Sequence, residues 1–436
     1  MIIVILNWND ALVFKIQMKC IEVITMFRLE RDFLPIGQGA FYAERIYIMH
    51  DKAPQLDKHI IFDCGALNKK LPSSAKTNLE LIEHVVNEYF KKYPFDVDTL
   101  FISHLDEDHC NGVEYILKKT GVKTIVLPLL SEAAKMIESI RIFSMWKGVS
   151  STTSSFLWNV LTDSYSLRTK LRDAHNNIPT IIWMKPGNIE QANEQNYLDV
   201  PTLSQDTNLF EVALDMCIAP LGISGTVSVP SWNEWIYKPF FNDYSNHRLI
   251  EDVNKKIAAA FGLASPKLTS KDLNGLMATK ADRIKLREEY KKTVKSSAKP
   301  SDRVLHYYSM VLASYPNKNW CKITKCIHGN EEILALNYAA GCLYMGDYPA
   351  KDYLTEVQKY FMSFDQVGTL QIPHHGANSS YNSELLKLNF NNIVSHGYNY
   401  NHPGGDIRFD IKNNGKTLFE VTQLKDSALS QTIETV

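Results

Sequence analysis

Residues 103–112 carry the densest group of metal-binding side chains in this chain. The segment reads Ser-His-Leu-Asp-Glu-Asp-His-Cys-Asn-Gly and follows an apolar, strand-like run at residues 97–102. Imidazoles and carboxylates suit zinc, manganese or iron, and the absence of paired cysteines argues against a closed structural zinc site. The segment therefore predicts a catalytic metal site with an open position. The candidate ligands are His104, Asp106, Asp108 and His109.

The spacing of these side chains predicts two metals. His104 and Asp106 alternate, so an extended backbone directs both to one side. Asp108 and His109 follow at the start of the next helix and face a second point in space. The alternative is a polar loop whose acid caps the helix that begins near Asn111, but a cap needs one side chain and leaves both histidines unexplained.

The run resembles the His-x-His-x-Asp-His signature of the metallo-β-lactamase superfamily, with Asp106 in place of the second His. That variant, followed by Asn-Gly, is similar to the hydrolase domain of the ComEC competence proteins and its soluble relatives. The resemblance covers about residues 20–220 and 303–430. It implies an α/β protein, a four-layer αβ/βα sandwich with the metals at one edge between the sheets.

Two later strand ends extend the resemblance. An apolar strand ends in Gly346-Asp347, where the superfamily has its metal-bridging Asp, and residues 373–376 resemble a His-His-Gly-Ser segment. The resemblance implies that Asp347 bridges both metals and that His374 is a ligand, with His375 as the alternative. Adjacent histidines at a strand end are also hard to explain by packing, because burying both leaves polar nitrogens to satisfy.

The ligand set implied by the resemblance is uneven. One metal receives His104 and Asp106, and a third His that the superfamily usually places near residue 220 is absent, so this metal lacks one protein ligand. The second metal receives Asp108, His109 and His374. Asp63, at the end of an apolar strand, is expected to orient the His-rich loop by a hydrogen bond, or else to form a turn.

The expected catalytic residues are Asp108, His375 and His402. His402 precedes a proline, as in a His-Pro pair of the ComEC-like relatives, and is a candidate to donate a proton to the leaving group or to bind substrate phosphate. An ordinary loop His is the alternative. The remaining histidines, His59 and His396 among them, fit no constellation and are expected to be structural or on the surface.

Glycines at positions 37 and 39 flank Gln38 and permit a tight turn or a close approach to a ligand. A hairpin turn explains them equally well. In the ComEC-like family the equivalent turn reads Asp-Val-Gly-Gln-Gly-Asp, so Pro35 and Ala40 replace both acids while the glycines and Gln38 remain.

Composition describes an ordinary globular chain of 436 residues, 45% apolar, with a net charge of -1, which can form one large or two smaller domains. Seven scattered cysteines without a Cys-x-x-Cys pair favour a reducing compartment. The apolar start, residues 1–6, is too short for a signal or a membrane span, so we expect a cytoplasmic protein that does not contact membranes. The expected divisions are an uncertain tail at 1–17, with Met18 or Met26 as alternative starts, a first part of the sandwich at 18–221, an insertion at 222–302 and a second part at 303–436.

The insertion is expected to be mainly helical. Its last helix, residues 280–299, is rich in lysine and arginine, which indicates either a solvated helix face or a basic surface that steers a phosphate-rich substrate. Its aromatic side chains either pack its own core or form a stacking platform, and the insertion is also a candidate to dock a protein partner. The aromatic residues are Trp232, Trp235, Tyr237, Phe240 and Phe241.

The expected chemistry is hydrolysis by water activated between two divalent metal ions, zinc or manganese. Asp106 adds negative charge and a hard oxygen, which favours manganese and a phosphodiester. The leading prediction is a nuclease or phosphodiesterase acting on DNA or a nucleotide-type substrate. A lactonase, thioesterase or peptidase remains an alternative because this fold hosts all of them, as does a metal-binding regulatory protein.

Overall fold

The computed structural model describes most of the residues expected to form the sandwich. The described ranges are 27–49, 54–145, 155–162, 171–184, 227–228, 235–241, 247–265, 268–297, 308–316, 321–333, 339–361, 363–397 and 402–435. The described ranges leave out the expected tail, the alternative starts, Trp232 and the position near residue 220 where the superfamily usually places a third His. No helix within these ranges has the length and apolar character needed to cross a bilayer.

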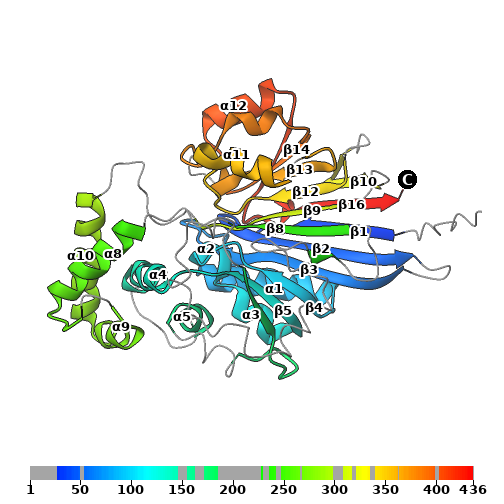
Figure 1. The fold of residues 1–436 in the computed structure, drawn as a ribbon. Helices are drawn as coiled ribbons and strands as arrows, with labels where there is room; N and C mark the ends of the chain where they lie inside the picture. The colour runs from blue at the N-terminus through cyan, green and yellow to red at the C-terminus, as the bar shows by residue number, and fades with distance from the viewer. Residues whose placement is uncertain are drawn as a thin grey trace, which may run out of the picture.

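Two mixed β-sheets pack face to face, and helices cover their outer sides (Figure 1). The first sheet contains β1 (Phe27–Phe33), β2 (Gly39–Met49), β3 (Pro54–Ala66), β4 (Val97–Phe101), β5 (Val122–Pro128), β6 (Thr180–Met184), β10 (Cys321–His328), β11 (Glu331–Ile333) and β16 (Leu429–Thr435). The second contains β7 (Val227–Ser228), β8 (Trp235–Phe240), β9 (Val311–Pro316), β12 (Gly341–Tyr344), β13 (Val367–Gln371), β14 (Asn392–His396) and β15 (Thr417–Val421). The strand orders among the described residues are β11-β10-β16-β1-β2-β3-β4-β5-β6 and β15-β14-β13-β12-β9-β8-β7.

Helices complete the expected four layers, which confirms the predicted fold class. Figure 1 shows α1 and α3 on the outer side of the first sheet, and α11 and α12 on the outer side of the second. The helices are α1 (Asn78–Lys92), α2 (Glu107–Cys110), α3 (Val113–Lys119), α4 (Glu132–Met145), α5 (Ser155–Thr162), α8 (His247–Ala260), α9 (Ser270–Met277), α10 (Lys280–Ser297), α11 (Ala350–Phe361) and α12 (Gly405–Asn413). Short 3₁₀ turns occupy Pro373–Gly376, Ser383–Lys387 and Lys425–Ser427.

Apolar spacing explains why these segments fold as they do. The side chain of Thr77 accepts a hydrogen bond from the Glu80 N–H and caps α1, whose apolar stripe at helical spacing is buried on one face. Between the sheets, the rings of Phe62 on β3 and Tyr344 on β12 stack with centroids 5.3 Å apart. The core therefore lies both between the sheets and under the helices.

Parallel strands of both sheets end at one shared edge. In the first sheet β3, β4 and β5 are parallel neighbours, and in the second β12, β13 and β14 are parallel neighbours. The loops after β4 and β12 lie close together at this edge. His104 in the first loop has its Nε2 atom 3.6 Å from Oδ2 of Asp347 in the second. Open α/β folds bind ligands outside the carboxyl ends of their strands, so this edge is where a site belongs.

The range expected to be an insertion contributes to the sandwich as well as to a helical lobe. Its strand β8 pairs with β9 in the second sheet, and Trp235 and Tyr237 are each only 1% exposed in the core. These aromatic side chains therefore do not form a stacking platform. Helices α8, α9 and α10 pack with α4 in a lobe that Figure 1 shows at the side of the sandwich.

Candidate metal centre

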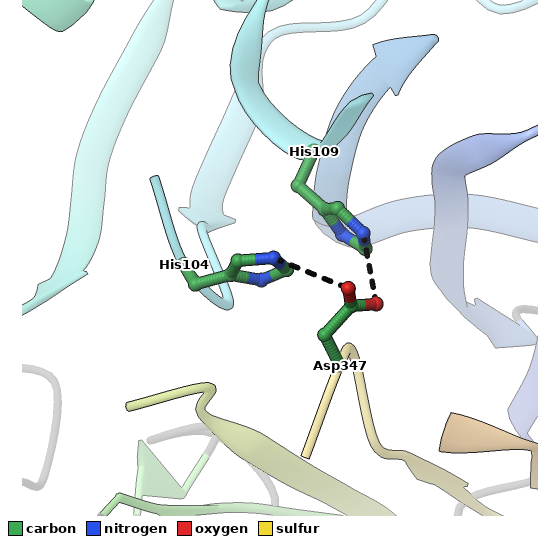
Figure 2. Close-up of side chains that lie close together, drawn as sticks. All are labelled: His104, His109 and Asp347. Carbon is green, nitrogen blue, oxygen red and sulfur yellow. Dashed lines mark ion pairs between the residues drawn. The ribbon is translucent and has the colours of Figure 1, made fainter. Parts of the chain in front are cut away.

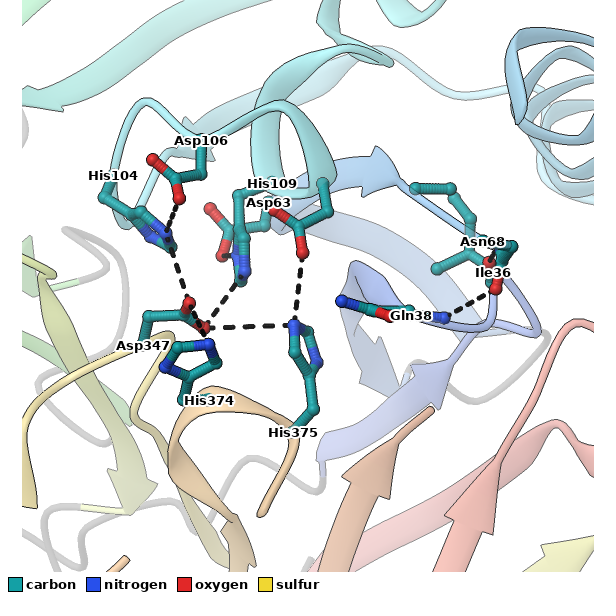
Figure 3. Close-up of polar contacts among 12 residues, drawn as sticks. Ile36, Gln38, Asp63, Asn68, His104, Asp106, His109, Asp347, His374 and His375 are labelled. Carbon is teal, nitrogen blue, oxygen red and sulfur yellow. Dashed lines mark hydrogen bonds and ion pairs between the residues drawn. The ribbon is translucent and has the colours of Figure 1, made fainter. Parts of the chain in front are cut away.

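The predicted metal-binding side chains from separate segments meet at the shared edge of the sheets (Figure 3). His104 and His109 come from the loop after β4 and from α2, Asp347 follows β12, and the two adjacent histidines follow β13. His104, His109, Asp347 and His375 are at most 2% exposed, whereas the His374 side chain is 24% exposed. The centre is thus buried on most sides and open beside His374.

Asp347 lies at the middle of the cluster. Its Oδ1 atom is 3.2 Å from His109 Nε2 and 3.9 Å from His375 Nε2. Its Oδ2 atom is 3.6 Å from His104 Nε2 and 3.5 Å from His374 Nε2. Figure 2 shows one ring nitrogen of His104 and one of His109 directed at the two oxygens of this carboxylate. Each oxygen of this carboxylate therefore faces its own pair of imidazoles.

Two carboxylates from the His-rich loop flank these pairs. Asp108 Oδ2 lies 3.3 Å from His375 Nε2, and Asp106 Oδ2 lies 3.8 Å from His104 Nε2. Potential ligand atoms of Asp108, His109 and His375 all lie within 4.8 Å of one another. The same holds for His104, His109 and Asp347.

The donor set fits divalent cations. His104 Nε2, His109 Nε2 and Asp347 Oδ1 are buried atoms without a hydrogen-bond partner among the described residues. Buried polar atoms nearly always have a hydrogen-bond partner, so three unpartnered atoms close to one another require an explanation. Ligands about 2.1 Å from a tetrahedral cation lie about 3.4 Å from one another, close to the 3.2–3.9 Å between Asp347 and the four imidazoles.

Asp63 and Ser103 fix the orientation of two imidazoles. Asp63 Oδ2 accepts from Ser103 Oγ at 2.7 Å and lies 2.9 Å from His109 Nδ1, so His109 Nδ1–H donates to it. Because Ser103 Oγ donates its proton to Asp63, it accepts from His104 Nδ1 at 2.9 Å. Both Nε2 lone pairs are then directed toward Asp347. The hydrogen bond expected between Asp63 and the His-rich loop is confirmed.

The loop with the adjacent histidines is held in an unfavourable backbone conformation. His374 and His375 have φ values of 49° and 55°, a left-handed region that costs free energy for residues other than glycine. The His374 N–H donates to the Gly346 carbonyl at 2.8 Å, and Gln371 Oε1 accepts from the Gly346 N–H at 2.8 Å. These bonds tie the loop to the residue before Asp347 and place one imidazole on each side of its carboxylate.

The charges of the cluster suit a cation. Burial alone would raise the pKa of Asp347, but His374, His109 and His104 lower it well below its usual range. Burial and the neighbouring His109 lower the pKa of His104 to about 4, so its lone pair is available at neutral pH. Burial opposes protonation of His109, yet the carboxylates of Asp347 and Asp63 raise its pKa well above the usual value. A bound cation would take the place of that proton.

The site thus consists of four imidazoles around a carboxylate. It lies at the edge between two sheets that helices cover on their outer sides. Residues 57–191 match the metallo-beta-lactamase superfamily model. The matched segment contains the complete His-rich loop together with Asp63, whereas Asp347 and the adjacent histidines lie beyond it. No curated protein matches the chain. Members of the matched superfamily typically bind divalent metal ions, and the described cluster of this chain has side chains that could hold a metal ion.

The structure brings together every predicted ligand but changes the place of the adjacent histidines. His375, not the expected His374, lies with Asp108 and His109. The physical reason is the left-handed backbone, which turns the His374 ring toward the other oxygen of Asp347. Of the two adjacent histidines, the alternative candidate His375 is therefore the one beside Asp108, and His374 lies on the side of His104.

His402 lies at the border of the cluster, and His396 lies beneath it. The ring centroid of His402 is 6.5 Å from that of His374, and His402 is half-buried. His396 ends β14, is fully buried, and has two ring nitrogens without a hydrogen-bond partner among the described residues. Burial and His375 lower the pKa of His396 to about 3, so it is a neutral neighbour of the site. Its position at a strand end was the only sequence signal for it.

Proposed function

We propose that the protein is a phosphodiesterase that holds two divalent cations, one on each oxygen of Asp347. The observation that carries this proposal is the division of the imidazoles, with His104 and His374 facing Oδ2, and His109 and His375 facing Oδ1. A carboxylate shared in this way neutralises two cations and fixes their separation.

This arrangement would provide four side chains for each cation, with Asp347 common to both. The first would be held by His104, Asp106 and Oδ2 of Asp347, and His374 fills the position left by the missing third His. The second would be held by Asp108, His109, His375 and Oδ1 of Asp347. Three carboxylates among these ligands make the set rich in hard oxygen, which supports manganese over zinc.

When bound, the two cations lower the pKa of a water molecule and stabilise the negative charge that develops on the ester. The protein contributes orientation, because Asp63 and Ser103 fix the tautomers of the imidazoles before substrate arrives. Burial, followed by His375 and His374, lowers the pKa of His402. A neutral His402 beside the centre supports binding of substrate phosphate through an N–H over the role of proton donor.

The phosphodiester substrate rests on the oxygen-rich ligand set and on the ComEC-like form of the His-rich loop. The basic helix α10 does not contribute to the proposal, because Figure 1 shows α4 between it and the strand ends that carry the site. Nucleic acid or a nucleotide-type diester is the proposed substrate class, and the helical lobe remains available for a protein partner.

The proposal is tested by assaying the protein with manganese, with zinc and without metal on bis(p-nitrophenyl) phosphate and on labelled single- and double-stranded DNA. We expect metal-dependent cleavage that falls by at least about 100-fold in Asp108→Ala, because a direct ligand is lost. The matched control is Asp352→Ala on the exposed side of α11, which should retain activity. Metal binding without cleavage of any diester would reject the phosphodiesterase and direct the search to carboxylic esters, peptides or a regulatory role.

A further inference from the structure

The turn at Gly37, Gln38 and Gly39 packs directly against the His-rich loop. Gly39 has a φ of +143°, and a Cβ atom there would lie 2.0 Å from the Gly65 carbonyl oxygen and 2.8 Å from that of Asp108. Only glycine allows the two backbones to approach so closely. The turn is therefore part of the wall of the metal centre and more than a hairpin connection.

The Asn68 side chain forms hydrogen bonds with two backbone groups of this turn. Its Oδ1 atom accepts from the Gln38 N–H at 2.8 Å, and its Nδ2 donates to the Ile36 carbonyl at 2.8 Å. The Gln38 carbonyl accepts from the Leu67 N–H at 2.8 Å. Asn78 fixes Asn68 in turn, by accepting from the Asn68 N–H at 2.7 Å. The position from which the Gln38 side chain extends is thus rigid.

The Gln38 side chain extends from this rigid turn toward the metal centre. Figure 3 shows its carboxamide directed to the side of the cluster that holds His375, away from Asn68. Gln38 is half-buried, and the structure gives its carboxamide no hydrogen-bond partner among the described residues. A donor and an acceptor are therefore available at the rim of the centre.

We propose that the Gln38 carboxamide binds an oxygen of the phosphate group held at the metal centre, with its N–H donating to that oxygen. This inference rests on the proposed function of the site. A neutral donor suits the position because a lysine or arginine there would repel the two cations, whereas an amide stabilises negative charge without that cost. Asn68 then acts as a positioning residue for Gln38.

The test measures the affinity of the manganese-loaded protein for inorganic phosphate by calorimetry. In Gln38→Ala we expect the phosphate dissociation constant to rise by roughly 10-fold, as for loss of a hydrogen bond to a charged group. Gln38→Glu should raise it further, because a carboxylate repels phosphate. Manganese affinity should be unchanged in Gln38→Ala and should not fall in Gln38→Glu, where the carboxylate attracts cations, so manganese binding also reports that the site is folded in both variants. Gln55→Ala, an exposed glutamine at the far end of β3, is the matched control.

Asn68→Ala should weaken phosphate binding at unchanged manganese affinity, as expected of a positioning residue. Unaltered phosphate affinity in Gln38→Ala, or no phosphate binding by the wild-type loaded protein, would overturn the inference. Its failure is separable from that of the proposed function. Diester cleavage with unchanged KM and kcat in Gln38→Ala would reject the role of Gln38 alone. Gln38-dependent phosphate binding without any cleavage would reject the phosphodiesterase alone.

Discussion

At the scale of single residues, the backbone of His374 and His375 decides which oxygen of Asp347 each imidazole faces. Two neighbours in an extended strand would point to opposite faces, whereas the left-handed conformation places both rings beside Asp347. We expect His375→Ala and His374→Ala each to reduce the bound manganese from two ions to one, measured by elemental analysis after dialysis. His84→Ala, on the exposed face of α1, should retain both ions. Two tightly held ions in either site variant would contradict the proposed ligand sets.

Asp63 provides a second residue-scale prediction, because it combines a hydrogen-bonding role with a φ of 57°. Asp63→Asn keeps a residue that tolerates this backbone but weakens the bonds to Ser103 and His109, so the affinity for metal should fall by about 10- to 100-fold. Asp63→Ala should lose the same affinity and also about 1 kcal/mol of stability through backbone strain. Metal titration and urea unfolding of both variants separate these effects. Equal stability of the two variants would show that the backbone is not strained.

At the scale of elements, the sequence predicts the strands that deliver the site better than it predicts the details of the site. Apolar runs ending in Asp63, His104 and Asp347 were recognisable because a buried strand and a following polar side chain leave a clear pattern. The division of roles between the adjacent histidines depends on two φ angles, which residue types do not specify. The last strand, β16, has no clear signal in the sequence, because its buried Gln431 interrupts the apolar alternation.

A buried hydrogen-bond network joins β2, β3 and α1. His59 Nε2 lies 2.7 Å from the Tyr89 hydroxyl, which accepts from Arg45 Nη1 at 2.7 Å. His59 Nδ1 donates to the Asp96 carbonyl at 3.1 Å, so the ring is satisfied in its neutral form. Burial, assisted by Arg45, lowers the pKa of His59 to about 4. This histidine is structural, which is one of the two roles that the sequence analysis left open for it.

The network predicts how stability depends on pH. An unfolded His titrates near pH 6.5, so below that pH the unfolded chain binds a proton that folded His59 binds only near pH 4. The contribution of His59 is therefore complete above about pH 6.5 and is lost as the pH falls to about 4, a change of about 3 kcal/mol. In His59→Phe we expect a smaller fall in the urea midpoint across this window. If the urea midpoint of His59→Phe changed with pH as much as that of the wild type, His59 would not be held neutral. The control is His84→Ala, whose urea midpoint should depend on pH as in the wild type.

At the scale of the whole molecule, Glu44 on β2 connects the two sheets. It is 2% exposed, and its Oε1 accepts from Arg31 Nε at 2.6 Å and from the Tyr344 hydroxyl at 2.8 Å. Its Oε2 accepts from the Tyr237 hydroxyl at 2.8 Å and from Ser314 Oγ at 2.6 Å. Arg31 belongs to the first sheet, and the other three donors belong to the second. One carboxylate thus links β2 to β8, β9 and β12.

Removing Glu44 should therefore affect both the fold and the metal centre. Glu44→Ala leaves Arg31 as a buried charge without its carboxylate, which costs about 3–5 kcal/mol of stability. Because Tyr344 lies three positions before Asp347, loosening β12 should also weaken manganese binding. Urea unfolding and manganese titration measure the two effects. The control is Glu384→Ala, which removes an exposed pair with Lys387 and should change stability by less than about 1 kcal/mol. If Glu44→Ala lowered the stability no more than this control, apolar packing alone would hold the two sheets together. The same packing would then also hold together the two halves of the metal centre.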